Sequence, residues 1–212
     1  MFQENNIVVL DCEIACSPDE LSTGWDDKHA LGLSLGGYYD YKAERITYFD
    51  QDCLWNTIRH LILRDPLIIS FNGKGFDGPL MWACLRHDGI DDEQCCAFEQ
   101  AWHRLWKKSY DILDEVWHVT GRDYAKGNSL DALCKANGLP QKTGHGAHAP
   151  KLWQSGRIAE VINYLQNDIL ITKQLAEYIT YHNGRLQRQA GLVTIRTISD
   201  VLRSRLAQEV KM

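Results

Sequence analysis

The 212-residue sequence lacks the features of a membrane or secreted protein. No apolar run approaches the ~20 residues of a membrane span. No secretory signal is expected, because the apolar run that follows Asn6 ends in acids. The seven cysteines have neither the paired spacing of a zinc site nor that of a disulfide framework, so we expect reduced, mostly buried thiols. These absences predict a cytoplasmic protein without membrane contact.

The chain also lacks an excess of positive charge. Its net charge is −5 and its pI is about 5.9. Proteins that coat nucleic acid rely on clustered Lys and Arg, so the composition argues against that mode of binding. With 44% hydrophobic residues and no internal repeat, the chain can bury a sizeable core. We expect one domain over residues 1–212, with its core at about 7–180 and a C-terminal extension at about 185–212.

The first informative segment is an apolar run, 7–14, that contains two acids, Asp11 and Glu13. Its composition predicts a buried strand. Strand side chains alternate between faces, so both carboxylates point one way and Cys12 points the other. An Asp-x-Glu on a strand is common by itself, and it indicates a functional site only together with acids from other segments.

A second acid follows another predicted buried strand, 67–71. The chain leaves it through Asn72-Gly73 into a loop that ends at Phe76-Asp77, and Gly78-Pro79 then opens a helix. Taken alone, Asp77 is a good helix N-cap. Asp111, further along the chain, is the second choice after Asp77 for the fourth acid ligand of a site, because it lacks the Asn-x-x-x-Phe-Asp setting.

The third segment is a long helix, predicted from apolar residues at spacings of three, four and seven between Ile158 and Ile179. Tyr164 and Asp168 are four apart and therefore share a helical face. Taken alone, they are typical of a core tyrosine and a solvated charge. In the order strand acids, loop acid and helical pair, the three segments predict a single acidic site.

Crowding four carboxylates is unfavourable, at roughly 4 kcal/mol per ionised pair 4 Å apart if the effective dielectric is about 20. Bound cations relieve this repulsion. All-oxygen ligands favour Mg²⁺ or Mn²⁺ over zinc. Two such ions about 4 Å apart can clamp the attacking and leaving oxygens of a phosphoryl displacement, which points to phosphodiester chemistry.

These motifs resemble the DEDD superfamily of 3′-to-5′ exonucleases in its tyrosine-bearing branch, and the stretch 71–81 is most similar to the proofreading domains of family B DNA polymerases. The resemblance implies an α/β, RNase H-like fold with a mixed five-stranded sheet flanked by helices. It also implies that Asp11 bridges both metals, that Glu13 and Asp168 complete the shell of the ion that activates water, and that Asp77 holds the second ion. Tyr164 would orient the attacking water.

The resemblance further implies that Asn72 and Phe76 touch the 3′-terminal nucleotides. Among the basic residues, Lys142 and Lys151 are the first candidates for phosphate contacts because of their loop setting. The expected function is a metal-dependent 3′-to-5′ exonuclease that releases nucleoside 5′-monophosphates, with single-stranded DNA as substrate; DNA repair, replication and phage-type roles all stay open. RNA trimming, endonuclease activity and a non-catalytic nucleic-acid-binding module remain alternatives. A polymerase or helicase partner and the oligomeric state stay open.

Other patterns predict the rest of the fold. We expect strands at 31–39, 45–49 and 191–198, and helices at 53–63, 93–106 and 200–210, with 109–117 continuing past Asp111. Asn128 or Ser129 caps a short helix that ends at Gly138. Two patterns have competing interpretations: Trp102 and Trp106 are core residues or base-stacking residues, and the loop pair His145 and His148 belongs to a substrate loop or, less favoured, to a zinc site.

Overall fold

The computed structural model describes residues 6–87, 92–122, 127–142 and 148–209, and the statements below concern these residues. A five-stranded mixed sheet has the order β3-β2-β1-β4-β5. Its strands are β1 (Ile7–Ile14), β2 (Leu33–Asp40), β3 (Arg45–Phe49), β4 (Leu67–Ser70) and β5 (Tyr110–Asp111). β1 pairs antiparallel with β2 and parallel with β4, and β4 pairs parallel with β5. The predicted α/β fold with a mixed sheet flanked by helices is confirmed.

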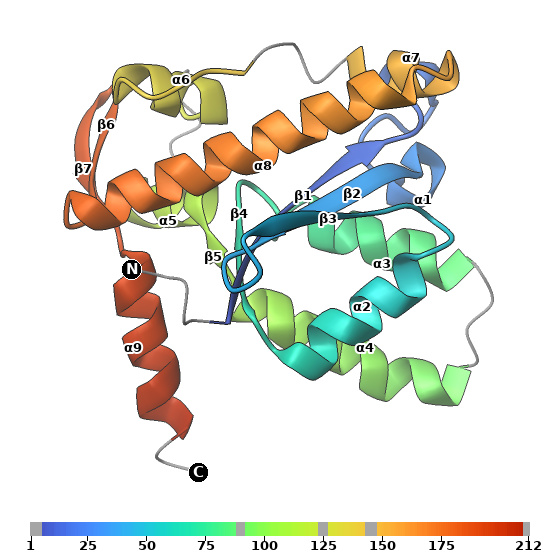
Figure 1. Cartoon of the computed structure of the whole chain (residues 1–212), viewed down its shortest axis with the longest axis horizontal. Helices are drawn as coiled ribbons and strands as arrows, with labels where there is room; N and C mark the ends of the chain where they lie inside the picture. The colour runs from blue at the N-terminus through green and yellow to red at the C-terminus, as the bar shows by residue number, and fades with distance from the viewer. Residues whose placement is uncertain (1–5, 88–91, 123–126, 143–147, 210–212) are drawn as a thin grey trace.

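Helices cover both faces of this sheet. They are α1 (Lys28–Leu31), α2 (Leu54–Arg64), α3 (Asp77–His87), α4 (Asp92–Lys107), α5 (Ile112–Thr120), α6 (Leu130–Ala136), α7 (Ala149–Gln154), α8 (Ile158–Tyr181) and α9 (Ile198–Glu209). The long helix α8 crosses one face, while α2, α3 and α4 lie on the other (Figure 1). None of the described helices is long and apolar enough to span a membrane.

The central strand β1 has this position because both of its faces are apolar. Ile7 and Val9 pack in the core cluster on the α8 side, whereas Val8 and Leu10 pack in the cluster formed with α2, α3 and α4. This alternation places residues with odd numbers on the α8 face, as strand geometry requires. Asp11 therefore continues the row of side chains that faces α8.

A glycine on β2 lets α8 approach the sheet closely. Gly37 is paired with Asp11 across the strands. A Cβ at Gly37 would lie 3.0 Å from Ile169 Cδ1 and 3.3 Å from Leu165 Cδ2 of α8. Both distances are tighter than ordinary Cβ contacts, so a side chain at position 37 would require Ile169 and Leu165 to shift. The glycine thus helps to bring the Asp168 face of α8 toward Asp11.

Several sequence expectations need correction. The fifth strand of the sheet is the two-residue β5, which lies in the segment 109–117 that was expected to be helical. Leu31 belongs to α1 and Gly32 is the C-cap of that helix, so neither is part of the strand expected at 31–39. The expected strand at 191–198 is only β7 (Gly191–Thr194), which pairs with β6 (Arg185–Arg188) in a separate hairpin. A two-residue strand has too few residues to show a period, and its pairing with β4 depends on residues about forty positions away.

The remaining elements agree closely with expectation. Ser129 is the N-cap of α6, its Oγ accepting a hydrogen bond from the Ala132 backbone N–H at 3.2 Å. Gly138 has a φ of 69°, as a residue that ends a helix often does. In the loop before α7, His148 precedes the helix, while His145 lies outside the described residues. None of the seven cysteines forms a disulfide in the described part of the chain.

Candidate active site

Three of the predicted acids meet between β1 and α8. One carboxylate oxygen from each of Asp11, Glu13 and Asp168 lies within 4.8 Å of the others. Asp11 and Glu13 point to the same side of β1, and Asp168 lies on the buried face of α8. Glu13 and Asp168 are almost completely buried, whereas Asp11 is partly exposed. Segments more than 150 positions apart in the sequence thus form one oxygen-rich cluster.

Burial and mutual repulsion make these acids difficult to ionise. Burial raises the pKa of Asp11 to about 7, with a further contribution from the negative charge of Asp168. Burial, followed by the charges of Asp11 and Asp168, raises the pKa of Glu13 well above its ordinary range. The cluster therefore favours a bound positive charge, which would restore the ionised state of its members.

A lysine supplies part of that charge. Lys142 Nζ donates a hydrogen bond to Asp168 Oδ2 and lies 5.6 Å from the centre of the Tyr164 ring. Burial lowers the pKa of Lys142, but Asp168 and Asp11 outweigh this effect and raise it above its ordinary value, so the ammonium group stays charged. The other oxygen of Asp168, Oδ1, is buried and has no hydrogen-bond partner among the described residues.

The donor set fits a divalent cation with oxygen ligands. Three carboxylates converge, and the unpartnered Oδ1 of Asp168 is a buried acceptor that a cation would satisfy. Such an arrangement suits Mg²⁺ or Mn²⁺ better than zinc, because neither His nor Cys ligands take part in this cluster of described residues.

Tyr164 lies beside the cluster, one helical turn before Asp168. Its side chain is mostly buried, and its hydroxyl oxygen accepts a hydrogen bond from Lys142 Nζ at 3.4 Å. Burial and the negative charge of Asp168 raise the pKa of the phenol above its ordinary value. Tyr164 is therefore a neutral hydrogen-bonding group at neutral pH and not a base.

Asp77 opens α3 and is also buried, but it is not part of the group of three among the residues described. Burial raises its pKa well above the ordinary range, and the charges of Asp11 and Asp111 raise it further. A hydrogen bond to the backbone of Cys12 acts in the opposite direction and links the start of α3 to β1. The charges of Asp77 and Asp11 thus influence each other, although Asp77 opens α3, which lies on the other face of the sheet from α8 (Figure 1).

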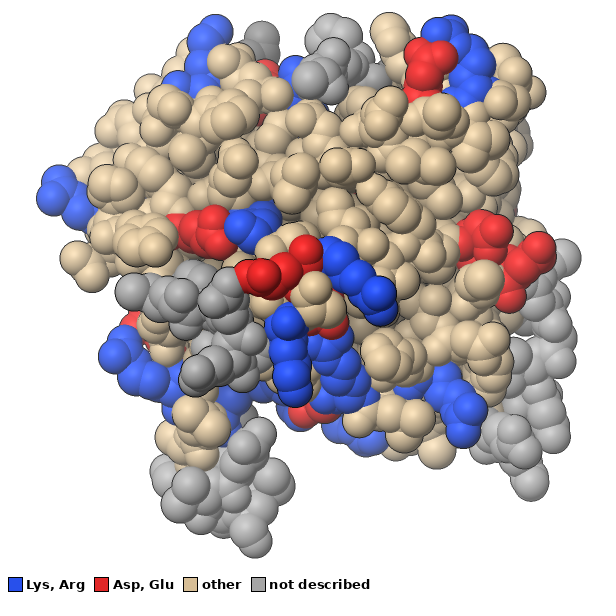
Figure 2. Space-filling model, viewed as in Figure 1, with Lys and Arg blue, Asp and Glu red and all other residues tan. Residues whose placement is uncertain are grey.

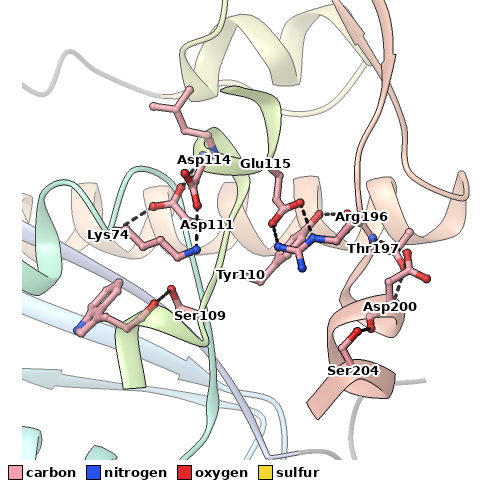
Figure 3. A network of polar contacts seen from close by, with 12 residues as sticks. Lys74, Ser109, Tyr110, Asp111, Asp114, Glu115, Arg196, Thr197, Asp200 and Ser204 are labelled. Atoms are coloured by element: carbon pink, nitrogen blue, oxygen red, sulfur yellow. Dashed lines mark hydrogen bonds and ion pairs between the residues drawn. The ribbon is translucent and has the colours of Figure 1, made fainter. Parts of the chain in front are cut away.

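Asp111, the second choice for a metal ligand, has a different structural role. Its Oδ1 accepts hydrogen bonds from the backbone N–H groups of Asn72 at 2.9 Å and Leu113 at 3.1 Å, and its Oδ2 accepts one from Lys74 at 2.9 Å. Lys74 Nζ also bonds Asp114 Oδ2 at 2.9 Å (Figure 3). Asp111 therefore caps α5 and fixes the loop that leads to Asp77.

A comparison with protein families agrees with this geometry. Residues 47–212 match the model of a family described as "Predicted 3'-5' exonuclease related to the exonuclease domain of PolB". The chain belongs to this family. The match includes Asp77, Tyr164 and Asp168 and begins after β1, so the assignment of Asp11 and Glu13 depends on their position beside Asp168. No curated protein matches the chain significantly.

In this member of the family of predicted exonucleases, a cavity of about 590 Å³ opens beside the acids. Asp11, Asn72, Lys142 and Asp168 line it on the side of the cluster. Other residues that line the cavity were not predicted as site residues from the sequence: Leu113, Trp117, Asn128, Leu130 and Asp131. Asp131 also accepts a hydrogen bond from the Lys142 backbone N–H at 3.0 Å. Acidic residues are common in the first turn of a helix, so nothing in the sequence around Asp131 indicated its contact with Lys142.

Other expected substrate contacts lie apart from this cavity. The half-buried Phe76 packs edge-on against Trp25, with ring centres 5.6 Å apart, and Lys151 is exposed on α7. Neither lines the cavity as described. Trp102 is 1% exposed and its Nε1 donates to the Gly78 carbonyl at 3.1 Å, while Trp106 packs against Gly78. Both tryptophans are core residues, which is the interpretation that their helical spacing favoured.

The surface agrees with the expectation from net charge. On the face shown in Figure 2, basic side chains are interspersed with acidic ones, and much of the area over α8 is uncharged. A broad basic face of the kind that coats nucleic acid is not visible in this view. Electrostatic contact with nucleic acid would therefore depend on local groups such as Lys142.

Proposed function

We propose that this chain is a metal-dependent 3′-to-5′ exonuclease that removes nucleoside 5′-monophosphates from single-stranded DNA. The observation that supports it is the convergence of Asp11, Glu13 and Asp168 to within 4.8 Å, beside a cavity that Asp11 and Asp168 line. Membership of a family of predicted 3′-5′ exonucleases supports the same reaction class. Asp77 would complete the set of acids from the start of α3.

The acids Asp11, Glu13 and Asp168, with Asp77, would hold two Mg²⁺ or Mn²⁺ ions. When bound, such ions supply positive charge to both the attacking and the leaving oxygen of a phosphodiester bond. Tyr164 would orient the attacking water through its neutral hydroxyl. Lys142, which now pairs with Asp168, would turn to a phosphate oxygen of the substrate.

The cavity suits a single terminal nucleotide. Its volume of about 590 Å³ is in the range of ~300–1,000 Å³ that is typical of small-ligand sites. The half-buried Trp117 gives the cavity an aromatic wall against which a base could stack, and Asn72 lies near the acids. A terminal nucleotide enters such a cavity only when it is unpaired, which favours a single-stranded end.

The decisive experiment is a cleavage assay with 5′-labelled single-stranded DNA and Mg²⁺ or Mn²⁺. We expect progressive shortening from the 3′ end and nucleoside 5′-monophosphates as products. Asp11→Ala should reduce the rate by at least about a hundredfold, because it removes an acid that would contact both ions. Absence of shortening with the wild-type protein, or equal shortening with Asp11→Ala, contradicts the proposal.

Two further substrates separate the alternatives. A circular single strand has no end, so its cleavage would indicate an endonuclease. An RNA of the same sequence, assayed in competition with the DNA, tests RNA trimming, because the 2′-hydroxyl is the chemical difference that a site must read. We expect the circle to stay intact and the DNA to be shortened faster than the RNA.

A further inference from the structure

A second pocket, distant from the acids, is strongly basic. It has a volume of about 430 Å³ and lies between the end of α4, the start of β5 and α9. Its cationic residues are Arg104, Lys107, Lys108, Arg196 and Arg205. We call this group the α4–α9 basic pocket. It is unexpected in a chain whose net charge is −5.

The pocket lies at the opposite edge of the sheet from the acidic site. Ser109, one of its lining residues, precedes β5, whereas Asp111 at the end of β5 anchors the loop to Asp77. Because β1, β4 and β5 are parallel, their first residues share one edge of the sheet and their last residues share the other. The pocket and the acidic site are therefore separate features, which share no lining residue.

The basic side chains are only partly neutralised. Lys108 and Arg205 share one acid, Asp65, at 3.3 Å and 2.9 Å. Arg196 pairs with Glu115, as Figure 3 shows, with Ser109 and Ser204 below this pair in the view. Five cationic side chains thus meet two acidic ones, which leaves an excess of three positive charges at the pocket.

The excess is concentrated on exposed residues of α4. Arg104 and Lys107 are three positions apart, so they are neighbours on one face of the helix, and neither forms an ion pair within the described residues. By contrast, Arg205 is held in place by bonds to the Asp65 carbonyl and carboxylate, at 3.0 Å and 2.9 Å. A fixed guanidinium beside two uncommitted cations suits successive anionic groups on an extended ligand.

We propose that the α4–α9 basic pocket binds the phosphate backbone of the nucleic-acid strand at a distance from its 3′ end. This proposal rests on the proposed nuclease function, which supplies a polyanionic ligand. Guanidinium and ammonium groups recognise phosphate oxygens without reading the bases, so the pocket adds affinity for long strands and no sequence preference. An acidic polypeptide has similar charge and is distinguished by the test.

The test measures binding of fluorescent single-stranded DNA by the full chain in EDTA, where metal-dependent cleavage cannot occur. We expect the double variant Arg104→Glu/Lys107→Glu to bind a strand of about 30 nucleotides at least tenfold more weakly, and a strand of about four nucleotides equally well. The slope of log affinity against log salt should fall by roughly 1.4, because two phosphate contacts are lost.

The matched control is Lys42→Glu/Arg185→Glu. Both of these residues are exposed and outside the pocket, and the change in net charge is the same. The control should bind both strands like the wild type. Equal binding of the long strand by wild type and pocket variant, equal loss in the control, or competition by polyglutamate at the same concentration as DNA would each overturn the proposal.

Folding and nuclease function are tested separately. Because Arg104 and Lys107 are exposed, their substitution should leave the melting temperature unchanged, and Arg104→Gln/Lys107→Gln provides a milder variant that should show a smaller loss of affinity. If the wild type fails to cut DNA but binds the long strand through these residues, the pocket is retained and the proposed function fails. If the wild type cuts DNA but the pocket variant binds the long strand normally, the proposed function is retained and the pocket proposal fails.

Discussion

At the scale of single residues, the clustered and buried acids of the site lower the stability of the fold. Each of the charged carboxylates of Asp11, Glu13 and Asp168 would be more favourable in water, yet the fold holds the three together in a largely buried cluster. Burial raises their pKa values, and Lys142 compensates for only one of the charges directly. The metal-free protein is therefore under electrostatic strain that a neutral substitution or a cation should relieve.

The Asp11→Asn variant should show this strain directly. The pKa of Asp11 is raised to about 7 in the folded protein, so ionisation of the group costs stability increasingly as the pH rises from about 4 toward 7. In EDTA at pH 8, we expect the variant to be more stable than wild type by roughly 1–2 kcal/mol, with the difference shrinking toward pH 4.

Thermal unfolding with and without Mn²⁺ completes the same experiment. Mn²⁺ should raise the melting temperature of the wild type, since it binds the folded state, and should raise that of Asp11→Asn much less. The conservative variant Asp19→Asn, on the surface segment η1 (Pro18–Glu20), serves as the control and should behave like the wild type. Identical melting of the wild type in EDTA and Mn²⁺ would contradict the clustered-acid site.

The Asp40–Arg64 ion pair gives a second prediction at this scale, with the opposite sign. Burial opposes ionisation of Asp40, but the Arg64 guanidinium and the backbone N–H groups of Ala43 and Lys42 outweigh it and hold the pKa of Asp40 below its usual range. A depressed carboxyl pKa contributes stability that is present above the unfolded pKa and is lost as the pH falls through the folded pKa.

Asp40→Asn should therefore lower the free energy of unfolding by about 1 kcal/mol between pH 5 and pH 7, as expected for a partly buried charged pair. Below about pH 4 the difference from wild type should diminish, because the wild-type carboxyl also becomes neutral. Urea unfolding at several pH values measures this. A difference that stays constant down to pH 2 would exclude the ion pair as its cause.

At the scale of elements, the site depends on the loop between β4 and α3. This loop contains the turn at Asn72, whose φ of 68° is left-handed, and it ends at Asp77. Four backbone N–H groups bond Asp111, at 2.9 to 3.2 Å, so the end of β5 fixes the loop before the chain enters α3. A change at Asp111 should thus act on Asp77 through the backbone.

Asp111→Ala should lower both stability and activity without removing a metal ligand. We expect a loss of about 2–4 kcal/mol, because several buried N–H groups lose their acceptor, together with slower cleavage of DNA. The melting temperature should still rise on addition of Mn²⁺, by about as much as in wild type. If the variant loses the Mn²⁺ effect as Asp11→Asn does, Asp111 is itself a ligand.

At the scale of the whole molecule, the sheet joins two core clusters. One, with α8, α5, α6 and α9, includes Ile198; the other, with α2, α3 and α4, includes Ile58. The C-terminal part is tied to the sheet by the bond from Tyr110 Oη to the Arg196 carbonyl at 2.6 Å. Because both clusters share the strands between them, we predict that the chain unfolds as one cooperative unit.

Ile58→Val and Ile198→Val test this prediction. Both residues are fully buried, and each truncation should cost about 1 kcal/mol. If the chain is one unit, each variant should shift a single transition seen equally by tryptophan fluorescence and by circular dichroism. Two transitions, with each variant shifting only one of them, would show that the C-terminal part unfolds by itself.

The elements that sequence predicted well are those with a local signature. The apolar run of β1, the spacing of buried residues along α8 and the turn at Asn72-Gly73 each follow from the periodicity or backbone preference of a few neighbouring residues. The two-residue strand β5 and the hairpin partner β6 have no such signature. The chain shows them only where neighbouring strands supply hydrogen bonds.

The sequence by itself determined which acids could act together, because strand alternation and helical spacing fix the side on which Asp11, Glu13 and Asp168 lie. Only the tertiary structure decided that Lys142 pairs with Asp168, that Asp111 holds a loop, and that Arg104 and Arg205 share a basic pocket. These contacts join residues 26 to about 100 positions apart. A short stretch of sequence does not specify contacts between residues so far apart in the chain, because these contacts depend on how whole elements pack.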